Sequence, residues 1–212
     1  MKIRIWDLPL RLFHWLLVMA VIGSFVSVKL GGNAMIWHGR FGYFVLTLIA
    51  FRLIWGFVGT YHARFVNFIR FPKAVLAYLK NPAETLGHSP LGAISVVVLL
   101  GLFLAQALAG LFASDDIAFD GPLAKYVSSS WVELLTSFHR LNEWVLLALV
   151  GVHIAAILYY KYAKRINLIS AMITGDKEWA DAAPLVQDDS KIRLKAMAIL
   201  IAIALIMYYF LR

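Results

Sequence analysis

The sequence predicts an all-α membrane protein, with a bundle of four transmembrane helices and a fifth transmembrane helix at the C-terminal end. Hydrophobic residues make up 62% of the 212 positions and charged residues only 15%, which lies outside the range of soluble domains. The mean hydropathy is +0.78. The apolar residues gather in five runs, each close to the roughly 20 residues that a helix needs to cross a bilayer.

The first two runs form a predicted helical hairpin. One extends from Leu8 to about Val28 and the next from about Ile36 to Val58. Gly31-Gly32-Asn33 between them is a typical turn sequence, because glycine adopts the backbone conformations that tight turns require. The N-terminus lacks a small-residue cleavage site after a short apolar core, so we expect the first run to be retained as a spanning helix.

The chain then becomes mixed before it returns to the membrane. Residues 59–90 interleave basic and aromatic side chains, which predicts an amphipathic helix in the membrane interface, ended by Asn81-Pro82. The third span runs from Leu91 to about Phe112. It carries no charged residue, and Gln106 is its only larger polar side chain.

The fourth span is predicted from about Phe138 to Tyr160, after a polar loop and a short run near residues 131–137. An acidic linker follows, and Leu194 to Leu211 forms a last apolar segment of just spanning length. We therefore divide the chain into a four-helix domain, residues 1–177, and a linker with the C-terminal helix, residues 178–212.

Cysteine usage and charge narrow the class of protein. The chain has no cysteine, which excludes disulfides, iron–sulfur clusters and cysteine-attached c-type haem within it. The net charge of +8 is interpreted as a membrane orientation signal rather than as a nucleic-acid surface. With the N-terminus in the cytoplasm, fifteen of the 20 Lys and Arg residues face inward, so we expect this orientation.

Four histidines lie in the predicted spans, at two depths. His139 and His153 are fourteen residues apart, about four helical turns, so both leave one face of the fourth span roughly 21 Å apart. In the predicted orientation His14 and His153 lie towards the cytoplasm, whereas His38 and His139 lie towards the outer surface. The histidines therefore form two pairs of matched depth.

These pairs predict two b-type haem sites, one held by His14 and His153 and the other by His38 and His139. A haem with two histidine ligands needs one imidazole on each side of the iron, from helices that face each other. This ligation leaves no open iron position, which suits electron transfer. Gly42, one turn after His38 on the same face, leaves room for a porphyrin. Basic side chains near the two levels are expected to pair with haem propionates: Arg11, Arg40, Arg52 and Arg140.

Other uses of histidine fit the sequence less well. His62 and His88 fall in the predicted cytoplasmic connection, where we expect them to be solvated. A zinc site is disfavoured because tetrahedral zinc needs three or four ligands around one point. A proton or ion transporter with a histidine relay is an alternative, although the fourth span offers no polar residue between Glu143 and His153 to bridge the two levels.

Several segments between about residues 5 and 177 carry a resemblance to a known family. They are Trp6–Trp15, Trp37–Tyr43, Phe51–Gly56, Leu86–Gly92, His139–Leu141, and His153 followed by Ala171–Gly175. Together they resemble the bacterial cytochrome b-561 and nickel–iron-hydrogenase cytochrome b family. The resemblance implies a four-helix di-haem cytochrome b of the bacterial inner membrane, and its ligand pattern falls on the same four histidines.

The resemblance also implies partners. Such proteins exchange electrons with the quinone pool on behalf of a periplasmic hydrogenase or a soluble c-type cytochrome; we expect the c-type cytochrome, because no surface for an iron–sulfur partner can be recognised. A stand-alone superoxide:quinone oxidase is an alternative, but it needs a basic outer funnel, and Asp115, Asp116 and Asp120 make the outer loop acidic. The bilayer is a further partner, a homodimer is considered, and nucleic acid is not expected.

Overall fold

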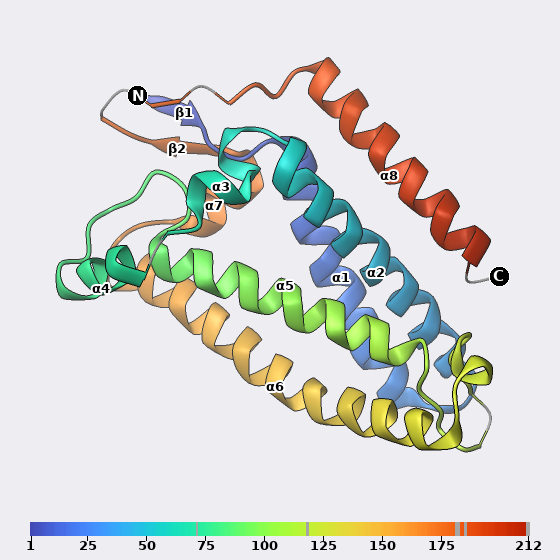
Figure 1. The fold of residues 1–212 in the computed structure, drawn as a ribbon. Helices are drawn as coiled ribbons and strands as arrows, with labels where there is room; N and C mark the ends of the chain where they lie inside the picture. The colour runs from blue at the N-terminus through green and yellow to red at the C-terminus, as the bar shows by residue number, and fades with distance from the viewer. Residues whose placement is uncertain (71, 118, 181–182, 185, 211–212) are drawn as a thin grey trace. The chain divides into compact units, whose positions relative to one another are not determined.

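The computed structural model describes residues 1–70, 72–117, 119–180, 183–184 and 186–210. Within them, the long helices are α1 (Leu8–Leu30), α2 (Met35–Val58), α5 (Pro90–Gly110), α6 (Ser129–Tyr162) and α8 (Ser190–Phe210) (Figure 1). Each is long and apolar enough to cross a membrane. The predicted helical membrane fold is therefore confirmed. Leu211, at the end of the predicted last span, lies outside the described residues.

Helix α6 begins nine residues before the predicted start of the fourth span. The run near Trp131 is continuous with the span rather than a separate element, because Leu134 and Phe138 continue its apolar spacing at helical intervals. At about 1.5 Å per residue, the 34 residues of α6 extend over roughly 51 Å, well beyond a hydrocarbon core of about 30 Å. Part of α6 therefore reaches past the membrane interior.

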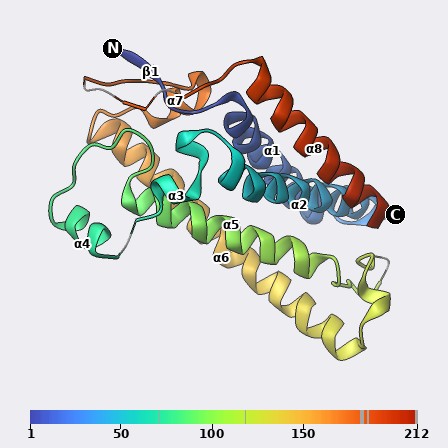
Figure 2. The same cartoon turned by 45° about the horizontal axis from the view of Figure 1, so that its top comes forward.

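Short helices occupy the connections (Figure 2). Helix α4 (Pro72–Lys80) ends beside Asn81-Pro82, as predicted, and has no buried residue, in keeping with an interfacial helix. The segment before it forms a separate turn and α3 (Phe65–Phe68) instead of one continuous amphipathic helix. Helix α7 (Leu168–Thr174) follows α6 and ends at Gly175, which has the left-handed conformation typical of a helix C-terminus. Three short 3₁₀ turns complete the described helical elements: Gly32–Ala34, Tyr61–Ala63 and Ala124–Tyr126.

A two-stranded ribbon that the sequence did not predict joins the N-terminus to the segment after α7. Strand β1 (Lys2–Arg4) pairs antiparallel with β2 (Asp176–Glu178), and Ile3 lies opposite Lys177. Beyond the strands, the N–H of Trp179 donates to the Met1 carbonyl at 2.9 Å. Strands of three residues are too short to give a periodic hydrophobic signal, so this pairing was missed.

The contacts divide the chain into two units, and each is described by itself. The first unit comprises Met1–Phe13, Arg52–Val98 and Gly151–Ala198. The second comprises His14–Phe51, Leu99–Val150 and Ile199–Arg212. Fully buried side chains of the first unit include Trp55, and those of the second include Leu48 and Ile49.

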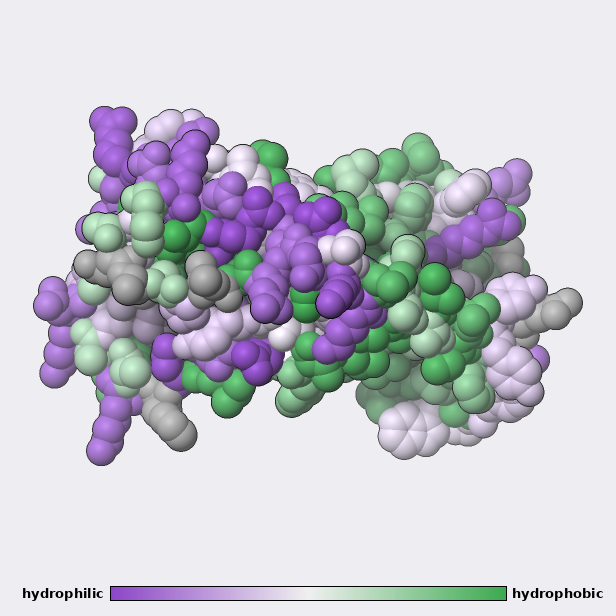
Figure 3. All heavy atoms as spheres, turned by 90° about the horizontal axis from the view of Figure 1, so that it is seen from above, coloured by the Kyte–Doolittle hydropathy of each residue, from purple (hydrophilic) through white to green (hydrophobic). Residues whose placement is uncertain are grey.

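Large hydrophobic side chains are also exposed along every long helix. Examples are Met19, Phe57, Val98, Val152 and Leu205. Hydrophobic residues cover much of the visible face in Figure 3. Such surfaces are unfavourable in water but suit helices that are surrounded by lipid.

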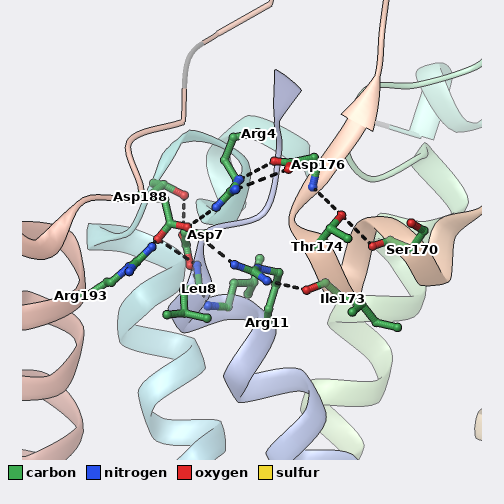
Figure 4. Close-up of polar contacts among 12 residues, drawn as sticks. Arg4, Asp7, Leu8, Arg11, Ser170, Ile173, Thr174, Asp176, Asp188 and Arg193 are labelled. Carbon is green, nitrogen blue, oxygen red and sulfur yellow. Dashed lines mark hydrogen bonds and ion pairs between the residues drawn. The ribbon is translucent and has the colours of Figure 1, made fainter. Parts of the chain in front are cut away.

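Asp188 joins the acidic linker to the N-terminal segment within the first unit (Figure 4). Its carboxylate accepts hydrogen bonds from Arg4, from the Leu8 N–H at 3.2 Å and from Arg193 Nε at 3.1 Å. Arg4 also donates to Asp176 on β2 at 2.6 Å. Burial acts to raise the pKa of Asp188, but Arg193, the Leu8 N–H and Arg4 together hold it below its usual range. We call this group, with β1 and β2, the N-terminal clasp.

Candidate functional site

The turn between α1 and α2 places His38 beside α1 in the second unit. Gly31 and Gly32 in this turn have φ values of 65° and 53°, which glycine adopts without strain. His38 Nδ1 then lies 2.9 Å from the Ser24 carbonyl oxygen. Because a carbonyl can only accept, Nδ1 carries the proton and Nε2 keeps a lone pair that can bind a metal.

His139 is held in the same way by α5. Its Nδ1 lies 2.9 Å from the carbonyl oxygen of Gln106. Gly110, one turn after Gln106, lies against the imidazole, and a Cβ at this position would come within 3.0 Å of His139 Cε1. The glycine therefore allows the ring to lie close to α5, with Nε2 again available as a ligand.

Two further polar side chains connect α5 and α6 around His139. Gln106 Nε2 donates to the His139 carbonyl at 3.0 Å. Asn142, only 3% exposed, donates to Gln106 Oε1 at 2.9 Å and to the Leu102 carbonyl at 3.1 Å. Neither residue was predicted to belong to the site. The available signals were that Gln106 is the one larger polar group of its span and that Asn142 follows His139 by three residues.

The imidazoles of His38 and His139 are neighbours in a T-shaped arrangement, with ring centroids 6.0 Å apart and planes at 86°. A transition metal lies about 2 Å from an imidazole nitrogen and the ring centroid about 1 Å further, so two rings on opposite sides of one ion are about 6 Å apart. A Cβ added at Gly42 would meet no atom within 4 Å, so the backbone beside His38 is open. The residues present therefore fit a bis-histidine haem. The structure brings the predicted pair together, and ligation by it stays a prediction.

A charge pair lies one turn beyond His139. Lys29 Nζ is 3.2 Å from Glu143 Oε1 and 5.0 Å from the ring centroid of Phe25. Partly exposed pairs contribute little to stability. The effect of Lys29 here is to balance the charge of the Glu143 carboxylate near the His139 imidazole.

The second predicted pair is divided between the units. His14 belongs to the second unit, where its ring is perpendicular to that of Trp15 at a centroid distance of 5.0 Å. His153 belongs to the first unit and is half-buried. Their pairing stays a prediction from depth and from the family resemblance.

Arg52 is the predicted propionate partner with the most favourable surroundings. It is only 2% exposed, its guanidinium lies 4.7 Å from the Phe65 ring, and neither terminal nitrogen hydrogen-bonds to a residue that the structure describes. Asp7 is near enough to interact with its charge. However, the Asp7 carboxylate already accepts from Leu10 N–H, Trp55 Nε1 and Thr60 Oγ1. Arg52 therefore has donors to offer to another anionic group.

The other three arginines have different surroundings. Arg11 donates to the Ile173 carbonyl at 2.6 Å and lies 3.7 Å from Asp188. Arg40 is exposed and lies over the Trp37 ring at 4.8 Å, and Arg140 is exposed. Their propionate roles stay predictions with less support than that of Arg52.

The expectation that His62 and His88 are solvated is wrong. His62 is 9% exposed, and His88 packs against Trp6 at 4.6 Å and Phe68 at 4.4 Å between ring centroids. The connection folds against the N-terminal tryptophan instead of extending into solvent. Burial lowers the pKa of His62; burial, followed by the charges of Arg52 and His62, lowers the pKa of His88 to about 3.

Comparison with known proteins places the chain in a family. A model of the prokaryotic cytochrome b561 family matches residues 5–175. The chain belongs to this family. As a family member it is a membrane b-type cytochrome, an electron-transfer protein with b-type haem. The matched region ends before the acidic linker and α8.

Relatives of this cytochrome b561 family member align over most of their length. It is 26% identical over 216 residues to a probable Ni/Fe-hydrogenase B-type cytochrome subunit of Rhizobium leguminosarum bv. viciae, covering 85% of the chain and 90% of the relative. A protein of the same name from Bradyrhizobium diazoefficiens is 27% identical over 215 residues, covering 84% and 87%. Another from Rhodobacter capsulatus is 25% identical over 220 residues, covering 85% and 83%. No solved structure gives a significant match.

Proposed function

We propose that this cytochrome is the membrane subunit that passes electrons between a periplasmic hydrogenase and the quinone pool, through two b-type haems. The names of the relatives, each aligned over at least 83% of its own length, support a hydrogenase as partner rather than the c-type cytochrome expected from the sequence. The family and the five apolar helices support a membrane electron-transfer role.

The close approach of the His38 and His139 imidazoles, with ring centroids 6.0 Å apart, is the observation that carries this proposal. They hold one haem, and His14 with His153 hold the other. A bound b-type haem supplies reversible one-electron chemistry at its iron. The carbonyls of Ser24 and Gln106 keep each imidazole in the tautomer that presents Nε2.

The orientation assigns a task to each site. With the N-terminus in the cytoplasm, the His38 and His139 site lies towards the periplasm and serves the partner, and the His14 and His153 site serves quinone near the cytoplasmic surface. Arg52 neutralises a propionate, since its donors are buried and without hydrogen-bond partners among the described residues. Asp116 and Asp120 in the outer loop favour a partner with a basic docking face.

The ligand assignment is tested by counting haems. The purified protein is expected to give a b-type reduced-minus-oxidised spectrum with two haems per chain. His139→Ala and His153→Ala are each expected to remove one haem, and a different one, because each histidine serves a separate site. His62→Gln, a change at a histidine outside both pairs, is expected to keep two. Loss of the same haem in both alanine variants contradicts the pairing, and absence of b-type haem contradicts the function.

The partner is tested in membranes that contain a nickel–iron hydrogenase. Hydrogen gas is expected to reduce the haem of the wild-type protein, and His38→Ala is expected to abolish the reduction of quinone by hydrogen. If a reduced c-type cytochrome donates electrons and hydrogen does not, the hydrogenase assignment is wrong.

A further inference from the structure

We infer that Gln106 and Asn142 are positioning residues that hold His139 in one orientation and thereby lower the redox potential of the His38 and His139 haem site. The inference rests on the proposed ligand role of His139. Gln106 and Asn142 are neutral side chains and are not among the proposed iron ligands.

Gln106 and Asn142 lie in α5 and α6, two of the helices that are long and apolar enough to cross a membrane. A polar side chain inside a bilayer is unfavourable unless it finds a partner, so hydrogen bonds between helices there are structurally important. Gln106 makes a reciprocal pair with His139: its carbonyl accepts from Nδ1 at 2.9 Å, and its Nε2 donates to the His139 carbonyl at 3.0 Å. The two helices are therefore joined at the ligand itself.

The hydrogen bonds of Asn142 fix the register of α5 against α6. Asn142, one turn after His139, donates both to Gln106 Oε1 and to the Leu102 carbonyl, one turn before Gln106. A sliding or rolling movement of α5 against α6 breaks at least one of these bonds. These bonds consequently keep the Gln106 carbonyl oxygen at a fixed distance from His139 Nδ1. This oxygen is a backbone atom, so a substitution at position 106 retains it and removes only the side-chain bonds that hold it in place.

The hydrogen bond that His139 donates from Nδ1 tunes its imidazole as a metal ligand. An imidazole that donates a short hydrogen bond from Nδ1 is a better electron donor at Nε2, which favours ferric over ferrous iron. Loosening the α5 and α6 contact weakens this bond and allows the ring plane to rotate. The potential of this site then rises, whereas the site of His14 and His153 is unaffected.

The test uses the full-length, haem-loaded protein with Gln106→Leu and Asn142→Leu, which remove the polar groups and keep similar bulk. Mutating a residue that hydrogen-bonds to a metal ligand typically lowers metal affinity by about tenfold or more. We therefore expect the preference for ferric over ferrous iron to fall about tenfold, which raises the redox potential of this haem by about 59 mV for one electron. The potentials of both haems are measured by optical titration. The low-spin ferric EPR signal, which depends on the angle between the ligand planes, is expected to broaden for one haem only.

Thr47→Val is the matched control. Thr47 is 8% exposed on α2, and its hydroxyl donates to the Tyr43 carbonyl of the same helix at 2.8 Å. It follows His38 by nine residues, which places it on the opposite face of the helix at 100° per residue. The variant loses one partly buried hydrogen bond of the second unit and is expected to leave the redox potentials and EPR signals of both haems unchanged.

The outcomes separate this inference from the proposed function. Two haems at wild-type potentials and unchanged EPR signals in both leucine variants overturn the inference and leave the function standing. A wild-type protein without b-type haem overturns the function. If the leucine variants do not accumulate, the redox potentials are measured for Asn142→Ser, which retains a shorter hydrogen-bond donor. A rise in the potential of one haem only supports the inference. Unchanged potentials overturn it.

Discussion

Replacing Gly42 by alanine tests whether a haem lies against α2 beside His38. Within the protein, the added Cβ meets no atom within 4 Å, and alanine is favoured over glycine inside a helix by about 1 kcal/mol. The fold is therefore expected to become slightly more stable. A porphyrin in van der Waals contact with Gly42 is displaced by the methyl group, and overpacking of this kind costs about 1–3 kcal/mol. Haem affinity is then expected to fall by about 5-fold to 150-fold.

Gly101→Ala is the control, because Gly101 lies in α5 of the same unit and is also open to an added Cβ. Haem content after dialysis against a haem scavenger and thermal unfolding are measured for both variants. The expected pattern is a higher unfolding temperature in both variants, with faster haem loss only in Gly42→Ala. Equal haem retention in the two variants refutes the placement of a porphyrin against Gly42.

Three further changes test the packing of the first unit. Asp7→Ala removes the acceptor of Trp55 and Thr60 and is expected to cost about 2–4 kcal/mol of unfolding free energy, measured by denaturation in detergent. Because His88 has its pKa lowered to about 3, stability is expected to be complete above about pH 6.5 and to decline from there towards pH 3, and His88→Gln flattens this dependence. Because the pKa of Asp188 is held low, the N-terminal clasp is expected to be stable above about pH 4 and to open as the pH falls below this value. Asp188→Asn is expected to speed hydrogen exchange of the β1 amides at neutral pH. Unchanged exchange contradicts this expectation.

The sequence was most informative where one physical constraint dominates. Spanning helices need about 20 apolar residues, so all five were visible as runs, and their ends shifted by only a few residues except in α6. Histidine is costly within a membrane, so depth alone paired His38 with His139, and the structure brings these two rings together. The pairing of His14 with His153 stays a prediction.

Contacts between distant segments were not predictable in the same way. Asn142 is a polar residue near the predicted start of the fourth span, and only the packing of α5 against α6 makes it a partner of Gln106. His62 and His88 follow no apolar period, yet the tryptophan at position 6 covers both. Their burial depends on tertiary packing, which a local pattern does not encode.

The N-terminal clasp has a consequence for how the molecule is made. The Met1 amino group donates to the carbonyl of Trp179, a separation of 178 residues, so β1 has no partner until α1, α2, α5 and α6 have all been synthesised. Such long-range pairing forms late in folding. A chain that is released from the ribosome before β2 is made has an unpaired N-terminal strand. The Leu8 N–H at the start of its α1 also lacks the Asp188 carboxylate as acceptor. Protection of the first five residues from an aminopeptidase therefore marks molecules in which synthesis has passed β2 and the clasp has closed.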